Sequence, residues 1–243
     1  MPNLHWTIPV ARWSSWPAVA AVAPDIGFIE PMLRRRLSSL SRMALKVAHD
    51  CVAGRSNVRV VFASRHGELR RTTDILRTIS AGEPVSPTSF SLSVLNAMSG
   101  VFGIARSDRS PASALSAGAQ TLGYALLEAH AQYATDPSAA VLVVYADEPA
   151  DAAYGTIEDE VQGGALAILL DETTAIGHLT CVTSSVNMPS GAAAPDGISP
   201  AQIPQMSFAT QSHAVLHCLE ARTTARWQCG PVVWEWSWHD GAV

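Results

Sequence analysis

Continuous apolar runs alternate along the chain with amphipathic segments, and together they predict strands and helices in turn. Runs such as 139–145 and 164–170 are typical of strands that are buried on both faces of a sheet. Apolar residues spaced three and four apart, as in 31–53, predict helices. The predicted order is a strand within 1–30, helix 31–53, strand 58–63, helices 68–80 and 89–104, a short extended piece 112–115, helix 117–133, strands 139–145, 164–170 and 178–186, helix 208–223 and strand 232–238.

Strands that alternate with buried helices predict an α/β fold in which helices cover both faces of a mixed sheet. A segment rich in Pro, Gly, Ala and Ser predicts a flexible loop at 187–206. We therefore expect one domain over residues 1–243. Its parts are an N-terminal segment and helix (1–57), a core (58–186), the loop (187–206) and a C-terminal helix and strand (207–243).

Three tryptophans alternate with other residues near the C-terminus. Trp234, Trp236 and Trp238 share one face of the predicted last strand, because successive side chains of a strand point to opposite sides. Packing in the core is the simpler explanation. An aromatic patch that faces a partner protein is the alternative.

Composition narrows the class of protein. The chain has 243 residues, of which 15% are charged, and a net charge of −5. The negative charge argues against nucleic-acid binding, and no apolar run reaches the roughly 18 residues of a membrane helix. Four cysteines without a CxxC pair, and the lack of a secretory signal, predict a cytoplasmic protein. The low fraction of charged residues favours a permanent protein partner.

Two groups of residues resemble reactive sites. His213 and His217 have the spacing of zinc ligands on one helix face, but no third ligand lies near them in sequence, and a polar helix face explains them equally. Ser64, His66 and Asp74 have the residue types of a catalytic triad without a GxSxG elbow. Because phosphate-binding loop motifs are also missing, we expect neither a metal nor a cofactor.

A longer stretch resembles the N-terminal half of a β-ketoacyl-acyl carrier protein synthase, a thiolase-like enzyme. Asn96-Ala-Met-Ser-Gly100 is similar to the Asn-x-x-x-Gly helix of that family, and Ser113 to Ala129 is similar to its nucleophile elbow and the Ala-rich helix after it. The segments 139–148 and 162–172 resemble its next two core strands. The resemblance implies a thiolase-like layered fold.

The chain departs from the family at the reactive position. Counting back three residues from Gly118 places Leu115 where the family has its nucleophilic cysteine. A leucine side chain cannot form a thioester. The half of the family that supplies two catalytic histidines also has no visible counterpart, so we expect no catalytic residues.

A short ketosynthase-like chain with an inactive elbow is similar to the chain-length-factor-like subunits of aryl polyene and xanthomonadin-type systems. The segments 31–42 and 62–69 also resemble that group. The resemblance implies a heterodimer with a full ketosynthase whose acyl tunnel this chain helps to shape. An acyl carrier protein is then an indirect partner, and a homodimer of the isolated chain stays open.

The same resemblance assigns roles to four sets of residues. They are the elbow position Leu115; the tunnel-wall residues Leu69, Thr72, Thr73 and Leu76; the residues of the elbow and preceding helix, Asn96, Gly100, Gly118 and Gln120; and the dimer-interface strand Ser110, Pro111, Ala112, Ser113 and Ala114. The alternative is an active acyl-thioester transferase or hydrolase that uses Ser113, Ser116 or His66.

Overall fold

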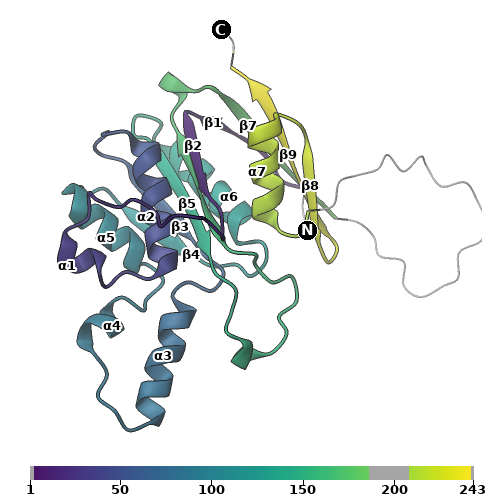
Figure 1. Ribbon diagram of the computed structural model, residues 1–243. Coiled ribbons are helices and arrows are strands. Elements are labelled where there is room, and N and C mark those ends of the chain that lie inside the picture. Colours follow the sequence, from purple (N-terminus) through teal and green to yellow (C-terminus); the bar gives the residue numbers. More distant parts are fainter. Residues whose placement is uncertain (1–2, 186–207, 242–243) are drawn as a thin grey trace, which may run out of the picture.

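Two β-sheets with helices between and beside them make up the structure, a computed structural model that describes residues 3–185 and 208–241 (Figure 1). The strands are β1 (His5–Val10), β2 (Arg12–Trp16), β3 (Arg59–Ala63), β4 (Ala112–Leu115), β5 (Val141–Asp147), β6 (Gly164–Leu170), β7 (Gly177–Ser185), β8 (Ala225–Cys229) and β9 (Val232–Asp240). The α-helices are α1 (Pro31–Arg34), α2 (Ser39–Val52), α3 (Leu69–Ser80), α4 (Pro87–Ser91), α5 (Ala97–Arg106), α6 (Thr121–Thr135) and α7 (Gln211–Ala221), with short 3₁₀ helices η1 (Ala152–Tyr154) and η2 (Glu172–Thr174).

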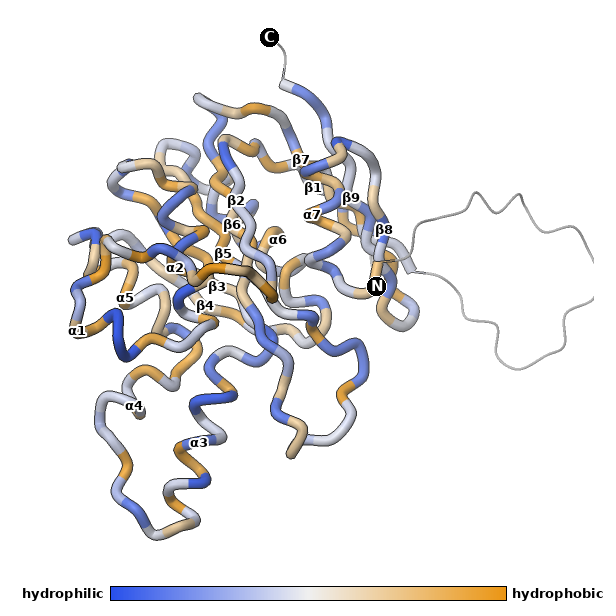
Figure 2. The backbone as a smooth tube through the Cα atoms, in the orientation of Figure 1, coloured by the Kyte–Doolittle hydropathy of each residue, from blue (hydrophilic) through white to orange (hydrophobic). Residues whose placement is uncertain are grey.

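The larger sheet has five strands in the order β2-β6-β5-β3-β4. Strand β3 runs parallel to β4 and β5, whereas β6 runs antiparallel to β5 and β2. Alternate residues face opposite cores: Phe62 and Val144 belong to the core with α2 and α5, and Val61 and Val143 belong to the core with α6. The expected mixed sheet with helices on both faces is therefore confirmed, and Figure 2 shows how hydrophobic its central strands are.

The smaller sheet is antiparallel, with the order β1-β7-β9-β8. Helices α6 and α7 lie between the two sheets, and their apolar side chains share one core with the facing sides of both (Figure 1). The opposite side of the smaller sheet carries polar side chains, such as the hydrogen-bonded hydroxyls of Thr7 and Thr180 and the Arg226–Glu235 ion pair. The layers thus run from α2 and α5 through the larger sheet and α6 and α7 to the smaller sheet.

The three C-terminal tryptophans pack in this shared core. Trp234 and Trp236 are almost fully buried and stack with ring centroids 6.0 Å apart. The indole N–H of Trp234 donates to Gln120 at 2.8 Å, and Gly123 of α6 lies directly against the same ring. The tryptophans therefore join α6 to the smaller sheet, which is the core-packing explanation and not a partner-facing patch.

Two of the predicted helices are interrupted. The segment 31–53 forms α1 and α2, because the Ser38 hydroxyl accepts the N–H of Ser41 and starts a new helix. The segment 89–104 overlaps two helices: α4 ends at Ser91, and α5 begins after Asn96, whose side chain does not cap it. A capping hydroxyl such as that of Ser38 competes with the continuous helix that apolar spacing predicts.

The strand content is also larger than predicted. The N-terminal segment forms two strands, because the chain passes from the smaller sheet to the larger one at Ala11. Strand β8 was not predicted; it pairs with β9 and alternates buried Ala225 and Trp227 with exposed residues. The predicted loop at 187–206 lies outside the described residues.

Gly123 allows a direct test of the contact between α6 and the smaller sheet. A Cβ at this position would lie 2.4 Å from the Trp234 ring and 2.6 Å from Gln211 Nε2. We expect Gly123→Ala to lower the free energy of unfolding by about 1–3 kcal/mol, because overpacking outweighs the better helix propensity of alanine. Urea unfolding measures the change.

The control is Gly100→Ala in α5, where a new Cβ would have no neighbour within 4 Å. This variant should be neutral or more stable by up to about 1 kcal/mol. Equal stability of the two variants would contradict the packing described for Trp234.

Candidate functional site

The predicted elbow lies at the end of β4, an edge strand of the larger sheet. Leu115 is half-buried and packs against the core between the sheets, and its carbonyl accepts the N–H of Ser64 at 3.3 Å. The chain then turns through Gly118, whose φ of +60° lies in the left-handed region that favours glycine, before α6 begins. The local geometry is thus a strand–turn–helix with an aliphatic residue at the predicted reactive position.

A buried carboxylate organises the neighbouring strand ends. Asp147, at the end of β5, accepts hydrogen bonds from Ser64 Oγ at 2.7 Å, Arg65 N at 2.8 Å and His66 N at 3.0 Å. Ser64 Oγ in turn accepts the N–H of Gly67 at 2.8 Å. Burial nevertheless raises the pKa of Asp147 above its ordinary value, although these hydrogen bonds act in the opposite direction. The network fixes the turn that follows β3.

The residues of the supposed triad have separate partners. Ser64 is fully buried against Asp147, whereas His66 Nε2 lies 2.7 Å from Glu160 Oε1. Asp74 lies on α3 and pairs with Arg77 at 3.2 Å. The structure therefore does not bring Ser64, His66 and Asp74 together as a nucleophile, a base and its orienting acid.

The other candidate nucleophiles are also engaged elsewhere. Ser116 Oγ donates to the carbonyl of Arg65 at 2.9 Å, and Ser113 Oγ accepts from Gln132 at 3.4 Å. Within 3–185 and 208–241, neither serine forms a hydrogen bond with a histidine. Activation of a serine hydroxyl needs a base within hydrogen-bond reach, so this arrangement offers no support for a serine-based transferase or hydrolase.

The cysteines lack the surroundings that produce a thiolate. Burial raises the pKa of Cys51 and Cys218 to about 12 and that of Cys181 well above its ordinary value. Burial and the neighbouring Asp159 also raise the pKa of Cys229. A nucleophilic cysteine needs a lowered pKa, so none of the four thiols is prepared for attack.

The two histidines of the supposed metal site have different surroundings. His217 packs beside the ring of Phe208, with centroids 5.1 Å apart, and contacts Thr223, whereas His213 borders a cavity beside the larger sheet. The described part of the chain contains no group of three His, Cys, Asp or Glu side chains that could hold a metal ion.

The four residues assigned to the elbow and preceding helix have separate surroundings. Gln120 accepts the indole N–H of Trp234, so it fixes the start of α6 against β9. Asn96 is exposed and its side chain does not cap α5, while Gly100 and Gly118 have open space around them. Of the four, Gln120 joins α6 to the smaller sheet and Gly118 forms the turn before α6.

The predicted tunnel-wall residues lie along one face of α3, which projects from the body of the molecule (Figure 1). Leu69 and Thr72 are half-buried, and Thr73 is buried with its hydroxyl 2.8 Å from that of Tyr154 in η1. Leu76 is 52% exposed. This face is covered near the start of α3 and open near its end.

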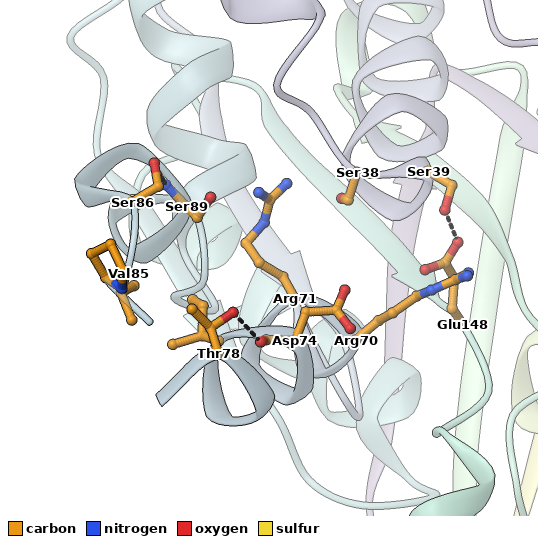
Figure 3. A pocket seen from close by; sticks show the side chains of 12 residues that line it. Ser38, Ser39, Arg70, Arg71, Asp74, Thr78, Val85, Ser86, Ser89 and Glu148 are labelled. Carbon is orange, nitrogen blue, oxygen red and sulfur yellow. Dashed lines mark hydrogen bonds between the residues drawn. The ribbon is translucent and has the colours of Figure 1, made fainter. Parts of the chain in front are cut away.

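The opposite side of α3 borders a cavity of about 440 Å³ that the sequence analysis missed (Figure 3). Arg70, Asp74 and Thr78 of α3 face Ser39 at the start of α2 and Ser86 before α4. Arg71 donates to the buried carboxylate of Glu68 at 3.3 Å. Balanced charges and hydroxyls suit the binding of a polar group, but the cavity presents no activated nucleophile.

Exposed apolar side chains gather on the helices that lead to β4. Phe90 of α4 is 64% exposed, Ile104 of α5 is 76% exposed, and Leu76 and Ile79 of α3 are exposed as well. Helix α5 packs against β4, whose outer edge has no partner strand among the described residues. An open edge beside apolar side chains is typical of a surface that another protein covers.

Comparison with protein families decides what the scaffold is. Residues 11–237 match the model described as beta-ketoacyl synthase, N-terminal domain. The chain belongs to this family. The identification from the motifs at 86–104 and 113–129 is therefore confirmed, together with the thiolase-like layered fold that corresponds mainly to the N-terminal half of a ketosynthase.

Solved structures of ketosynthases and chain length factors have the same fold. A chain of the complex of the ketosynthase ApeO with its chain length factor ApeC from Xenorhabdus doucetiae is 25% identical, with a TM-score of 0.72, over 96% of this chain and 99% of that one. The ishigamide ketosynthase/chain length factor is 17% identical, with a TM-score of 0.56, over 74% of this chain and 67% of that one. A beta-ketoacyl synthase from Burkholderia phymatum STM815 is 13% identical, with a TM-score of 0.52, over 70% of this chain and 53% of that one.

No curated protein matches the chain. No helix in the described part is long and apolar enough to cross a membrane.

The Asp147 network predicts a pH-dependent effect on stability. In Asp147→Asn, the new amide N–H₂ would face a backbone N–H that now donates to the carboxylate, which should cost about 1–3 kcal/mol. Because its raised pKa makes the folded state hold the proton more tightly, the stabilising contribution of Asp147 falls as the pH rises. The difference in unfolding free energy between wild type and variant should therefore narrow as the pH rises above about 4, the ordinary pKa of an aspartate.

Urea unfolding at several pH values measures this difference. Asp74→Asn on the surface of α3 is the control and should cost no more than about 1 kcal/mol. A difference that widens with rising pH would contradict a raised pKa for Asp147 in the folded protein.

Proposed function

We propose that this chain is a non-catalytic, chain-length-factor-like subunit that pairs with an active β-ketoacyl-acyl carrier protein synthase in polyene or fatty-acid-type biosynthesis. The observation that carries the proposal is Leu115 at the elbow of a ketosynthase scaffold. Decarboxylative condensation needs a thiolate nucleophile and an oxyanion site. The buried thiols and the occupied Asp147 network support a scaffold without this chemistry.

The edge of β4 supports pairing with a second ketosynthase fold. The carbonyls of Pro111 and Leu115 accept hydrogen bonds from Val60 of β3 and from Ser64 just after it. Ala112 and Ala114 therefore direct their N–H and C=O groups to the open edge. A strand of the partner would satisfy these groups, and the exposed apolar residues of α3, α4 and α5 would be buried around it. A second copy of this chain could use the same edge when the ketosynthase is missing.

Helix α3 supports a role in shaping the acyl tunnel. Its start is anchored by Thr73 and Tyr154, whereas Leu76 presents an aliphatic side chain on the open part of the same face. An anchored helix with an exposed apolar residue can form a fixed wall against a growing acyl chain. Leu69, Thr72, Thr73 and Leu76 are therefore the residues that would set where the chain stops.

The solved ApeO–ApeC complex supports the kind of partner. Its title describes a ketosynthase in complex with its chain length factor, and a chain of that complex matches nearly the full length of this protein. By analogy, the partner of this chain is a full-length ketosynthase with its own cysteine. The acyl carrier protein would deliver substrate to that subunit in the cytoplasm, and this chain would need no cofactor.

A charge on the open edge tests the pairing. Ala112 is exposed in the isolated chain, so Ala112→Asp should leave its folding unchanged. It should weaken association with the co-expressed ketosynthase at least about tenfold, because the new carboxylate would be buried without a counter-charge. Pull-down with the tagged ketosynthase and size-exclusion chromatography measure the effect.

The control variant is Ala21→Asp, which places the same charge on an exposed loop outside the proposed interface. Equal association of both variants with the ketosynthase would refute the use of the β4 edge.

A bulky residue on α3 tests the tunnel. Leu76→Trp should shift the products of the ketosynthase pair towards shorter chains, since the indole would occupy space that the growing chain needs. Mass spectrometry of the released acyl chains measures the shift. Ile176→Trp, at an exposed aliphatic position before β7, is the control. The assignment of α3 fails if both variants give the wild-type product spectrum.

A further inference from the structure

A second cavity, of about 450 Å³, lies between the larger sheet and α7, and it has no part in the proposed function. Its inner surface is mainly apolar. Leu166 of β6 and Leu216 of α7 provide large apolar side chains, whereas the indole of Trp16 packs with the core on the α2 side of the sheet. Its size falls within the usual 300–1,000 Å³ of small-molecule sites, which combine an apolar lining with a few polar groups.

Three polar side chains that border this cavity are unused. Gln162, His213 and Glu220 all border it, and none of their side chains forms a hydrogen bond or ion pair with another residue in 3–185 or 208–241. This contrasts with the adjacent Asp147 network, in which each polar group has a partner. Gln162 and Glu220 are exposed and His213 is half-buried, so all three are accessible to a ligand that enters the cavity.

The spacing along α7 places an apolar residue between two polar ones. His213, Leu216 and Glu220 are three and four residues apart and therefore share one face of the helix. The two polar residues are about 10 Å apart along the helix axis, given a rise of about 1.5 Å per residue. A ligand that packs on Leu216 can thus extend its polar head to the Glu220 carboxylate.

The opposite wall of the cavity is built on paired strands, because Ala165 of β6 pairs with Trp16 of β2 and with Ala146 of β5. Gly163 and Gly164 have φ values of +83° and +106°, and a Cβ on Gly164 would lie 2.8 Å from the carbonyl oxygen of Trp16. Pro17 and Ala18 continue the apolar lining into an exposed loop in which Val19 is 90% exposed. The cavity is therefore preformed, and apolar surface extends beyond its mouth.

We propose that this cavity binds a small amphipathic molecule that packs an apolar ring or short chain against Leu216 and places a hydrogen-bond-donating head on Glu220. An ammonium head fits best, because it forms a charge-assisted hydrogen bond with the carboxylate. A hydroxyl head binds more weakly, and a carboxylate head is repelled. The inference is independent of the pairing with a ketosynthase.

Three probes that share a phenyl group and differ in their polar head test the proposal on the full chain: 2-phenylethylamine, 2-phenylethanol and phenylacetate. Saturation-transfer NMR titrations should give a Kd on the order of 1 mM for the amine, as expected for a ligand of this size. The alcohol should bind more weakly and phenylacetate weakest. Leu216→Trp should weaken amine binding at least about tenfold, since the indole fills the cavity.

Charge variants at the exposed Glu220 keep the test decisive if Leu216→Trp does not fold. Glu220→Gln should weaken amine binding about three- to tenfold, and Glu220→Lys should reverse the preference in favour of phenylacetate. Glu83→Gln, in the turn after α3, makes the same charge change away from the cavity and should have no effect. The proposal is overturned if the amine shows no saturable binding up to about 20 mM, or if the order of the probes is the same in wild type and Glu220→Lys.

Discussion

The burial of both faces of the larger sheet is the constraint on which the rest of the structure depends. Residues of β3, β5 and β6 point alternately into two apolar cores, so no polar group can be placed on either face without a hydrogen-bond partner. Exposed backbone and functional side chains can then occur only at the outer strands and at the strand ends. The open edge of β4 and the polar cluster around Asp147 occupy these two kinds of position.

The cluster at the strand ends shows how a catalytic scaffold can serve a structural task. The resemblance to ketosynthases predicts a nucleophile at the elbow after this strand. Here Leu115 packs into the core, and the carboxylate of Asp147 is used to hold the backbone of Arg65 and His66. The chain thus has a strand–turn–helix at this place, with an aliphatic residue at the predicted position of the nucleophile. This arrangement is consistent with the proposed non-catalytic role.

The sequence predicted most of this fold because its signals are local. The apolar runs at 139–145 and 164–170 identify strands that are buried on both faces, and the motif around Asn96 and Gly118 identifies the family. Features that depend on distant contacts could not be predicted. Ser64 meets Asp147 across 83 residues, and Gln120 meets Trp234 across 114 residues. Neither pair has a spacing that marks it in the sequence.

The candidate site was predicted only in part, for the same reason. Helix spacing places Leu69, Thr72, Thr73 and Leu76 on one face of α3, but it cannot show that Tyr154 covers one end of that face. The cavity on the other side of α3 is formed by four segments that meet only in the folded chain. The division of the predicted helix 31–53 at Ser38 also reflects a capping hydroxyl, which apolar spacing ignores.

The central claim is that this chain contributes to condensation without forming a thioester itself. The most direct test of this claim is intact-mass spectrometry of the reconstituted pair after incubation with an acyl thioester. The products released with and without this chain are then compared. We predict an acyl adduct on the ketosynthase alone and a product length that changes when this chain is left out. A covalent acyl adduct on this chain, or identical products from the ketosynthase by itself, would contradict the account.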